Sequence, residues 1–364
     1  MLAREADQSV TRIDAARSYR WIFIVVGLML FCVGLPGSAH VIMGSKSLPL
    51  RIAEADLVVR GRIVDPDAVF VSEAGQTRRR LVEVEVLEAL KGKTASERLR
   101  IAQDGHDVPR YRVGDEALFF LTAIGKSREL RALAVPGGPA FVSSQEHEDR
   151  FLIEPPHGAT LLSAARTLAT SETLPTVSER IAAIRTATLD LLTSGDARLG
   201  ATALASLVLS PDAAFVAAED LPRLEAFLAD ASVSIGLRAG VLAELERREL
   251  LEGPAHWRAL LDQAGPEDLA TAIRAAGAHP SEPVRTFLLA RLTSPDEQSE
   301  IAAEAAIALG AWRDPSLVPV LAEALERARA REDRRLEGAV IRGLRRIGSG
   351  EARAVLAATG GRDD

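Results

Sequence analysis

Hydrophobic and polar residues follow two different periods along this chain, and the change falls near residue 155. Between about residues 50 and 154, short segments alternate with a period of two, the pattern of strands that bury one face. The clearest is RLVEVEVLEAL at 80–90, where valines alternate with glutamates. Five or six such segments, separated by Gly, Asp and Pro and without helical crossovers, predict an antiparallel barrel or sandwich. The other strands are predicted at 57–64, 98–103, 117–122, 130–134 and 151–153.

From about residue 159 the apolar residues follow the period of an amphipathic helix instead. Alanine and leucine dominate this part of the chain, and aromatic residues are sparse. One stripe with helical spacing consists of Ile301, Ala305, Ala308, Leu309 and Trp312, and a second consists of Leu336, Val340, Leu344 and Ile347. Such stripes predict helices that pack one face against neighbouring helices.

Equivalent apolar positions recur about every 34 residues in the helical part. The markers of the second helix in each unit are Leu207, Leu245, Ala276, Leu309 and Leu344, with spacings of 38, 31, 33 and 35 residues. The segments PRLEAFL at 222–228 and PVLAEAL at 319–325, 97 residues apart, share Pro and two Leu at the same offsets. Because a two-helix unit of this length buries its apolar face only against its neighbours, the repeat predicts an α-solenoid.

The N-terminus has the layout of a secretory signal peptide. Residues 21–35 form an uncharged apolar run of 15 residues, with arginines before it and PGSA at 36–39 after it. A membrane-spanning helix needs about 20 apolar residues, so the run favours a signal cleaved after Ala39. The alternative is an uncleaved inner-membrane anchor formed by residues 21–35. We therefore expect export to the periplasm or beyond, with a signal peptide at 1–39, a small β-barrel domain at 40–154 and a helical repeat domain at 155–364.

Composition narrows the range of functions. The 364 residues are 47% hydrophobic and 26% charged, enough apolar content for a sizeable core. The formal charge of −7 argues against a protein that holds nucleic acid through phosphate contacts. The single cysteine, Cys32, lies in the N-terminal apolar run, which argues against a disulfide framework, a thiolate zinc site and a cysteine nucleophile.

Few residues suggest catalytic chemistry. The sequence lacks a Gly-x-Ser-x-Gly nucleophile elbow, two histidines at i and i+4, and a phosphate-binding Gly-x-x-x-x-Gly-Lys loop. Asp104, His106 and Asp107 are suitable ligands for a divalent ion, but a polar turn between strands explains them more simply. The run EHED at 146–149 is interpreted as a solvated loop. We expect no cofactor and no enzymatic activity.

Arginines gather near the C-terminus, after a helical part that is acidic overall. At 100° per residue, Arg335, Arg342, Arg345 and Arg346 lie opposite the stripe from Leu336 to Ile347, so they can face solvent together. The simpler interpretation is a solvated face balanced by Glu332, Asp333 and Glu337. The functional interpretation is a partner-binding site for an anionic surface: an acidic protein, lipid headgroups or a second copy.

Two family resemblances rest on short segments. ADLVVRGR at 55–62, VEVLEALKG at 84–92 and YRVGD at 111–115 followed by LFFL at 118–121 resemble the bacterial, cysteine-free form of the OB-like barrels of netrins and tissue inhibitors of metalloproteinases. The cysteine-anchored N-terminus by which the eukaryotic inhibitors reach a protease metal has no counterpart here. DPSLVPVL at 314–321 and EPVR at 282–285 resemble HEAT repeats, in which Asp and Arg side chains often bridge successive units.

Together these features predict an α+β multidomain protein, with an N-terminal antiparallel OB-like β-barrel followed by an all-α HEAT-like solenoid. The predicted function is that of an exported, non-enzymatic scaffold whose solenoid binds a protein partner while the barrel supplies a second contact. The alternatives are an envelope enzyme or enzyme subunit with a metal site in the β-domain, and a peripheral membrane scaffold. No nucleic-acid partner is expected.

Overall fold

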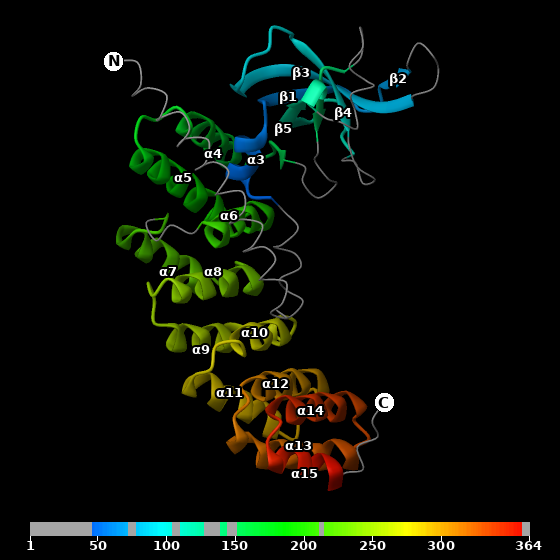
Figure 1. Cartoon of the computed structure of the whole chain (residues 1–364), viewed down its shortest axis with the longest axis vertical. Helices are drawn as coiled ribbons and strands as arrows, with labels where there is room; N and C mark the ends of the chain where they lie inside the picture. The colour runs from blue at the N-terminus through cyan, green and yellow to red at the C-terminus, as the bar shows by residue number, and fades with distance from the viewer. Residues whose placement is uncertain are drawn as a thin grey trace, which may run out of the picture. The chain divides into compact units, whose positions relative to one another are not determined.

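The computed structural model describes residues 46–71, 78–103, 110–126, 139–143, 151–210 and 215–358. Within these ranges strands come first and helices follow (Figure 1). The described residues belong to one compact unit. The apolar run at 21–35 and the cleavage position at Ala39 lie outside the described residues, so the signal peptide stays a prediction. No helix in the described ranges combines the length and the apolar character needed to cross a bilayer.

Five strands close into a barrel. Their order around the ring is β1, β3, β4, β6, β5 and back to β1, and every neighbouring pair is antiparallel except β4 and β6, which are parallel. This ring confirms the predicted barrel, and its strand order is that of an OB-fold. The short strands β2 and β7 pair with β3 and β5 outside the ring. The bounds are β1 Leu57–Asp65, β2 Val69–Val71, β3 Arg78–Lys91, β4 Arg98–Gln103, β5 Glu116–Ala123, β6 Phe141–Ser143 and β7 Phe151–Leu152.

The barrel interior is filled by alternate residues of its strands. Val59, Val84 and Phe119 are among the residues of one buried cluster, and Tyr111 packs in it with its ring centroid 5.6 Å from that of Phe119. Gly61 lies where β1 passes close to β3. A side chain at this position would overlap Val84, so glycine is what allows the two strands to approach.

The sequence located the long strands better than the short elements. The predicted segments 57–64, 80–90, 98–103 and 117–122 correspond to β1, β3, β4 and β5, and 151–153 corresponds to β7. The predicted strand 130–134 lies outside the described residues. Strands β2 and β6 were not predicted. Helix α3, Leu48–Glu54, precedes β1 and was not predicted either.

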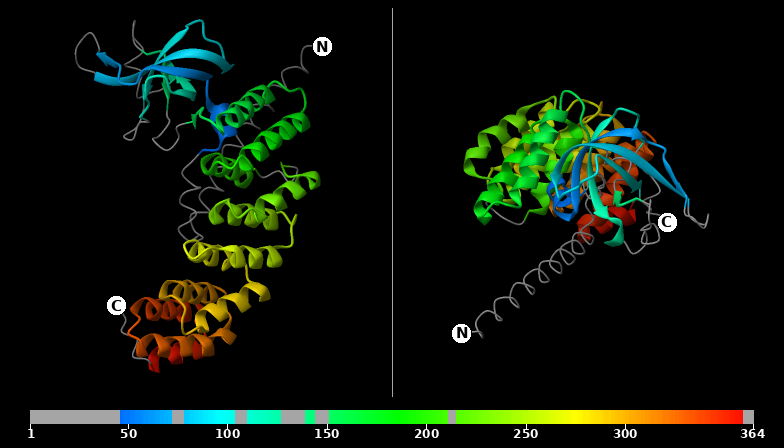
Figure 2. Two further views of the ribbon diagram at one scale, coloured as in Figure 1. Left: turned by 180° about the vertical axis from the view of Figure 1, so that it is seen from behind. Right: turned by 90° about the horizontal axis from the view of Figure 1, so that it is seen from above.

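The helices that follow are arranged in two rows of stacked helices (Figures 1 and 2). In the second row each of α6, α8, α10, α12 and α14 packs on the next, and in the first row α9, α11, α13 and α15 pack in the same order. The bounds are α4 Gly158–Ser171, α5 Val177–Leu192, α6 Ala197–Leu209, α7 Leu221–Ala229, α8 Ile235–Arg247, α9 Gly253–Gln263, α10 Leu269–Ala276, α11 Glu282–Thr293, α12 Ser299–Ala311, α13 Val318–Ala330, α14 Arg334–Ile347 and α15 Gly350–Ala358.

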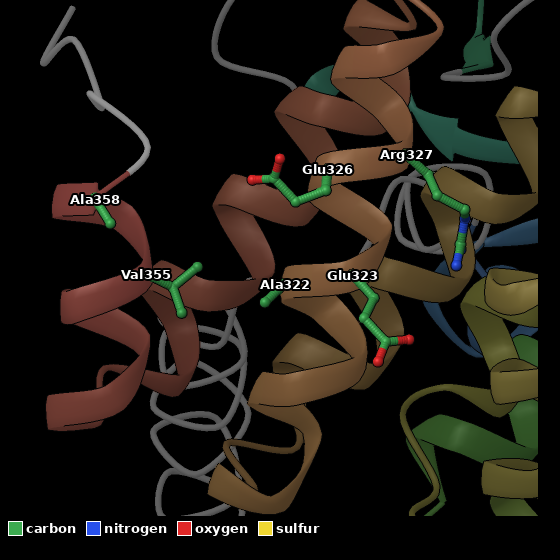
Figure 3. Close-up of a pocket in the computed structure, with 6 residues that line it drawn as sticks. All are labelled: Ala322, Glu323, Glu326, Arg327, Val355 and Ala358. Carbon is green, nitrogen blue, oxygen red and sulfur yellow. The ribbon is translucent and has the colours of Figure 1, made fainter.

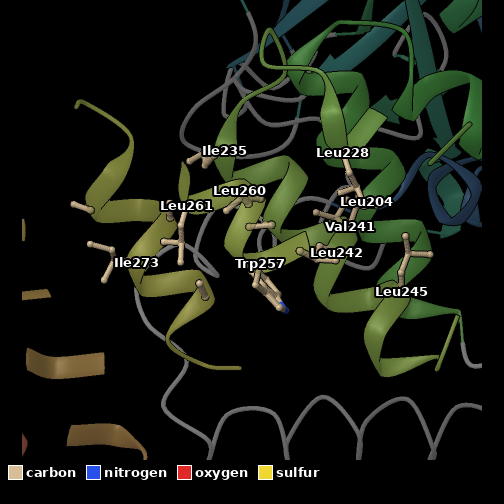
Figure 4. Packing of buried hydrophobic residues seen from close by; sticks show 14 of the residues in the cluster. Leu204, Leu228, Ile235, Val241, Leu242, Leu245, Trp257, Leu260, Leu261 and Ile273 are labelled. Carbon is tan, nitrogen blue, oxygen red and sulfur yellow. The ribbon is translucent and has the colours of Figure 1, made fainter. Parts of the chain in front are cut away.

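The predicted repeat is confirmed by the places of its markers. All five markers are buried, one in each helix of the second row, and the two proline segments form α7 and α13 with Pro in the first turn. Figure 4 shows the packed side chains of the middle units, including Leu245 and Trp257. Between α12 and α14 the contact is made by Gly310 and Gly343, and a Cβ on Gly343 would lie 2.9 Å from the carbonyl oxygen of Ala306. The absence of side chains lets these two backbones touch.

The barrel and the helical array share one hydrophobic cluster. Leu48 and Ile52 of α3, together with Phe151 of β7, belong to the same buried cluster as the array helices. Three polar links reinforce the junction. Lys91 Nζ donates to the carbonyl oxygens of Ile52 and Ala53 and to Glu172 Oε1 (2.8, 3.0 and 2.9 Å). Arg51 stacks over Phe151, with its guanidinium carbon 5.5 Å from the ring centroid.

The third link joins Arg166 of α4 to Glu88 of β3. Arg166 Nε and Nη2 donate to the two carboxylate oxygens of Glu88 at 2.9 and 2.7 Å. This bidentate pair fixes the orientation of the guanidinium relative to the carboxylate. This hydrogen-bonded guanidinium lowers the pKa of the Glu88 carboxyl below its ordinary value. The N-terminal helices of the array are therefore covered by a β-domain of the same chain.

Candidate interaction surface

Helix α14 carries all four arginines that the sequence analysis singled out. Asp333 caps its N-terminus by accepting the backbone N–H of Leu336 at 3.0 Å, and Ser299 Oγ donates to the same carboxylate at 2.7 Å. Gly348, with φ of 63°, ends the helix in the left-handed conformation that glycine adopts readily. These two ends fix which residues of α14 face the core.

The structure places the apolar stripe of α14 inside and the arginines outside. The stripe from Leu336 to Ile347 is buried in the shared cluster. The four arginines are exposed, and we call them the α14 arginine face: Arg335, Arg342, Arg345 and Arg346. Their role in binding a partner stays a prediction.

The members of this face differ in how their charge is balanced. Arg335 Nη2 lies 2.8 Å from Glu300 Oε1 of the preceding second-row helix, and both side chains are about half exposed. Arg342 and Arg346 have no acidic side chain in ion-pair contact among the residues that the structure describes. The two acidic residues at the start of α14 have other contacts, since Asp333 caps the helix and Glu337 pairs with Arg329 at 2.8 Å.

The neighbouring arginines of α13 serve the fold. Arg327 Nη2 donates to the carbonyl oxygen of Leu292 at 2.5 Å, and Arg331 Nη1 donates to that of Pro295 at 2.7 Å. Both acceptors lie at or just beyond the C-terminus of α11, where helical carbonyls lack intrahelical partners. The arginine-rich segment therefore divides into residues that tie successive units together and residues that face outward on α14.

Ion pairs also bridge successive units, as the HEAT resemblance implied. Arg285 Nη1 lies 3.1 Å from Asp314 Oδ2, and Arg285 Nη2 donates to Ser316 Oγ at 2.9 Å. Hydrogen bonds from the backbone and side chain of Ser316, together with the nearby Arg285, lower the pKa of the Asp314 carboxyl. In the second row, Arg274 of α10 lies 3.9 Å from Glu304 of α12. Ion pairs of opposite charge therefore link successive units in each row.

A half-buried cluster joins α8, α9 and the end of α10. Glu246 Oε2 accepts the indole N–H of Trp257 at 3.0 Å and lies 2.5 Å from His279 Nδ1, while the imidazole stacks on the indole with centroids 4.2 Å apart. Burial lowers the pKa of His279 despite the adjacent carboxylate. Sequence analysis missed Glu246 and His279, which lie 33 residues apart and carry no local motif. The contacts indicate a structural joint between three helices.

An open groove of about 630 Å³ lies between α13 and α15 in the first row (Figure 3). Its lining is mainly apolar, with acidic side chains at the edge. None of the lining residues belongs to the α14 arginine face, and none is a histidine, cysteine, serine or threonine: Ala322, Glu323, Glu326, Arg327, Val355 and Ala358. The groove therefore has no serine, threonine or cysteine nucleophile and no histidine base among its lining residues.

The predicted metal ligands cannot be placed. Asp104, His106 and Asp107, and the run at 146–149, lie outside the described residues. Within the described ranges, no group of three or more His, Cys, Asp or Glu side chains is arranged to hold a metal ion. The metal site in the β-domain therefore stays an untested alternative.

The comparison with protein families agrees with the array. Residues 285–364, which run from α11 to beyond α15 and include the α14 arginine face, match the family model described as HEAT repeats. No curated protein and no solved structure matches the chain significantly. The C-terminal part of the array is thus similar to HEAT repeats in sequence as well as in the stacking of its helix pairs.

Proposed function

We propose that this chain is an exported scaffold protein and that its HEAT-like array binds a protein partner on the α14 arginine face. HEAT repeats commonly mediate protein–protein interaction, and stacked helix pairs offer extended surfaces to a partner. The match of residues 285–364 to HEAT repeats supports this class of function. We further propose that the chain acts without catalysis.

One observation supports the α14 arginine face as the binding surface. Arg342 and Arg346 are exposed and lack an acidic neighbour among the described residues, whereas Arg274, Arg285 and Arg335 are balanced by carboxylates of adjacent units. Exposed charges that the fold does not use attract a partner of opposite charge and orient it as it approaches. Because both side chains are exposed, we expect them to contribute little to packing.

The barrel supplies the other end of this scaffold. Its junction with the array combines the shared hydrophobic cluster with the links of Lys91 and Arg166. A domain held in this way keeps a fixed orientation to the first helices. We propose that any second contact made by the barrel is presented at a fixed position with respect to the array.

The binding role is tested by charge reversal in the full chain. Wild type, the variant Arg342→Glu/Arg346→Glu, and the control Arg100→Glu/Arg112→Glu are crosslinked in cells and purified from envelope extract. Arg100 and Arg112 are exposed arginines of the β-domain, so the control changes net charge equally. We expect a partner that wild type and control capture and that the α14 variant loses. Equal capture by all three chains would contradict the proposal.

Export is tested separately by determining the N-terminus and compartment of the chain. Cleavage after Ala39 gives an exported protein that begins at His40. A chain that retains Met1 and stays with the membrane would support the anchor formed by residues 21–35. A chain that retains Met1 in the cytosol would contradict export.

A peripheral membrane scaffold is the second candidate, because arginines also bind anionic lipid headgroups. The observation that favours it is the same unbalanced pair on α14. Vesicles of phosphatidylglycerol and phosphatidylcholine provide the test. Binding that depends on Arg342 and Arg346 and disappears with pure phosphatidylcholine would favour the membrane role over the protein partner.

A further inference from the structure

The groove between α13 and α15 has a floor of small apolar side chains. Ala322 of α13 faces α15, which contributes Val355 and Ala358 to the lining (Figure 3). The volume of about 630 Å³ lies within the range of protein binding sites, and the groove is open to solvent. An apolar floor that is open in this way suits side chains that project from a larger partner better than an enclosed small molecule.

Two carboxylates flank this floor, and the fold uses neither of them. Glu323 and Glu326 are exposed, and among the described residues neither has an ion-pair or hydrogen-bond partner. Glu326 extends toward α15 and Glu323 away from it, so an apolar side chain placed over Ala322 has a carboxylate on either side (Figure 3). The arginine of the lining, Arg327, is committed to the preceding helix of the row, where it donates to the carbonyl oxygen of Leu292 at 2.5 Å. The edge of the groove is therefore negatively charged.

Neither the rest of the chain nor a lipid surface matches this combination of an apolar floor and an acidic edge. Residues 359–364, which follow α15, read TGGRDD and contain no large apolar side chain. A second copy is disfavoured because the chain carries a formal charge of −7, so that association would bring acidic surfaces together. Anionic lipid headgroups would be repelled by the two carboxylates. A matching occupant is both apolar and basic.

We propose that the groove between α13 and α15 is a second docking site, which binds a basic amphipathic helix of a partner protein. Apolar side chains at helical spacing lie on the floor, and Lys or Arg side chains beside them pair with Glu323 and Glu326. An amphipathic helix in an apolar groove is a recurring mode of recognition, and the small floor residues allow close approach. The site goes beyond the proposed function, because it does not use the α14 arginine face and it selects a partner of opposite charge.

An unbiased peptide selection tests the occupant. A library of random peptides of roughly 16 residues, long enough for a helix, is displayed on phage and selected against the full chain. Binders are then screened against Ala322→Arg, which fills the floor with a side chain that favours helix. The matched control is Ala330→Arg, exposed in the same helix but outside the lining. We expect peptides that bind wild type and the control but not Ala322→Arg, and that carry Lys or Arg beside apolar residues at i and i+3 or i+4.

The contribution of the carboxylates is measured by fluorescence anisotropy with a selected peptide. Glu323→Gln/Glu326→Gln should weaken binding about three- to tenfold, because two exposed ion pairs are lost. The control Glu225→Gln/Glu267→Gln removes two other exposed glutamates that have no ion pair among the described residues, and it should behave as wild type. The variant Arg342→Glu/Arg346→Glu should still bind the peptide, so that the two docking sites are tested separately.

Several outcomes would overturn the basic-helix proposal. They include groove-dependent peptides that are acidic or uncharged, peptides that bind the Gln variant as tightly as wild type, and a selection that yields no groove-dependent peptide. Concentration-dependent dimerisation that Ala322→Arg abolishes would overturn it in favour of a second copy. Deletion of residues 359–364 should leave the affinity unchanged, and binding that is seen only after this deletion would overturn it in favour of an intramolecular occupant.

Discussion

The two ends of the helical array differ in what covers their outermost helices. At the N-terminal end, helix α3 and the barrel cover the first helices, and Arg166 and Lys91 find carboxylates across the junction. At the C-terminal end, no described helix follows α14 in its row, and Arg342 and Arg346 face outward without acidic partners in the described ranges.

This difference separates stability from binding. A solenoid needs both ends protected, because each unit buries its apolar face only against its neighbours. The barrel protects one end with apolar contact. At the other end α15 packs on α13 and α14, and the outer face of α14 carries the exposed arginines for which we propose a partner. Substitutions at the two ends should therefore affect different properties of the protein.

The largest effect is expected at the N-terminal end. Ile52 is 1% exposed and belongs to the cluster shared by barrel and array. Replacing Ile52 with Ala should lower the free energy of unfolding by about 2–5 kcal/mol, through lost burial and the cavity left behind. A denaturant titration monitored by circular dichroism measures this loss. The control is Leu50→Ala, because Leu50 lies in the same helix and is 39% exposed. A loss no greater than that of the control would argue against a shared core.

The next effect is expected where α12 and α14 touch. Gly343→Leu forces a side chain against Gly310 and the carbonyl oxygen of Ala306. We expect a loss of about 2–3 kcal/mol, since overpacking a close contact costs this much. The helical control is Gly236→Ala, where a Cβ meets nothing within 4 Å. That control should gain about 0.5–1 kcal/mol from helix propensity, and a stabilising Gly343→Leu would refute the close contact.

The regular elements of the fold could be predicted from the sequence, whereas two short elements could not. The alternation in 80–90 and the 34-residue repeat identified β3 and the second row, because both depend on regular local patterns. Helix α3 was missed since seven residues are too few to show a helical period. Its conformation depends on the burial of Leu48 and Ile52 against distant elements. Strand β6 has three residues and is defined by its pairing with β4 and β5.

The candidate surface was predictable in position but not in charge balance. Helical periodicity places Arg335, Arg342, Arg345 and Arg346 on one face. Whether each charge is compensated depends on contacts with units about 35 residues away, as between Glu300 and Arg335. The simpler interpretation, a solvated face beside Glu332, Asp333 and Glu337, stays a prediction. Asp333 caps α14 and its carboxylate also interacts with the charge of Arg335, whereas Glu337 pairs with Arg329.

A smaller effect is expected at the cap of α14. The backbone N–H of Leu336 and the hydroxyl of Ser299 lower the pKa of Asp333 below its ordinary value of 3.8. The ionised cap therefore adds stability that is present above that value and is lost as the pH falls toward the lowered pKa. Asp333→Ala should cost about 1 kcal/mol at neutral pH. Asp333→Asn keeps an acceptor and should lose part of the acid sensitivity, which denaturant titration at several pH values would reveal; an unchanged pH profile would contradict this role.

The smallest effects on stability are expected for the arginines at the two ends of the array. A double-mutant cycle between Arg166 and Glu88, each replaced by Ala, should give a small positive coupling, because the two-bonded pair is partly exposed. That coupling should fall as the pH drops and Glu88, whose pKa Arg166 lowers, becomes protonated.

The corresponding change at the other end is Arg342→Ala/Arg346→Ala. Since neither side chain pairs with a described carboxylate, its free energy of unfolding should stay within about 0.5 kcal/mol of wild type. Its affinity for the envelope partner captured by wild type should nevertheless fall. A clear loss of stability in this variant would mean that the two arginines close the array, as Arg166 does at the barrel, and that the C-terminal end is not free for a partner. Stability that is unchanged while affinity falls would establish that the two ends of one array serve different purposes.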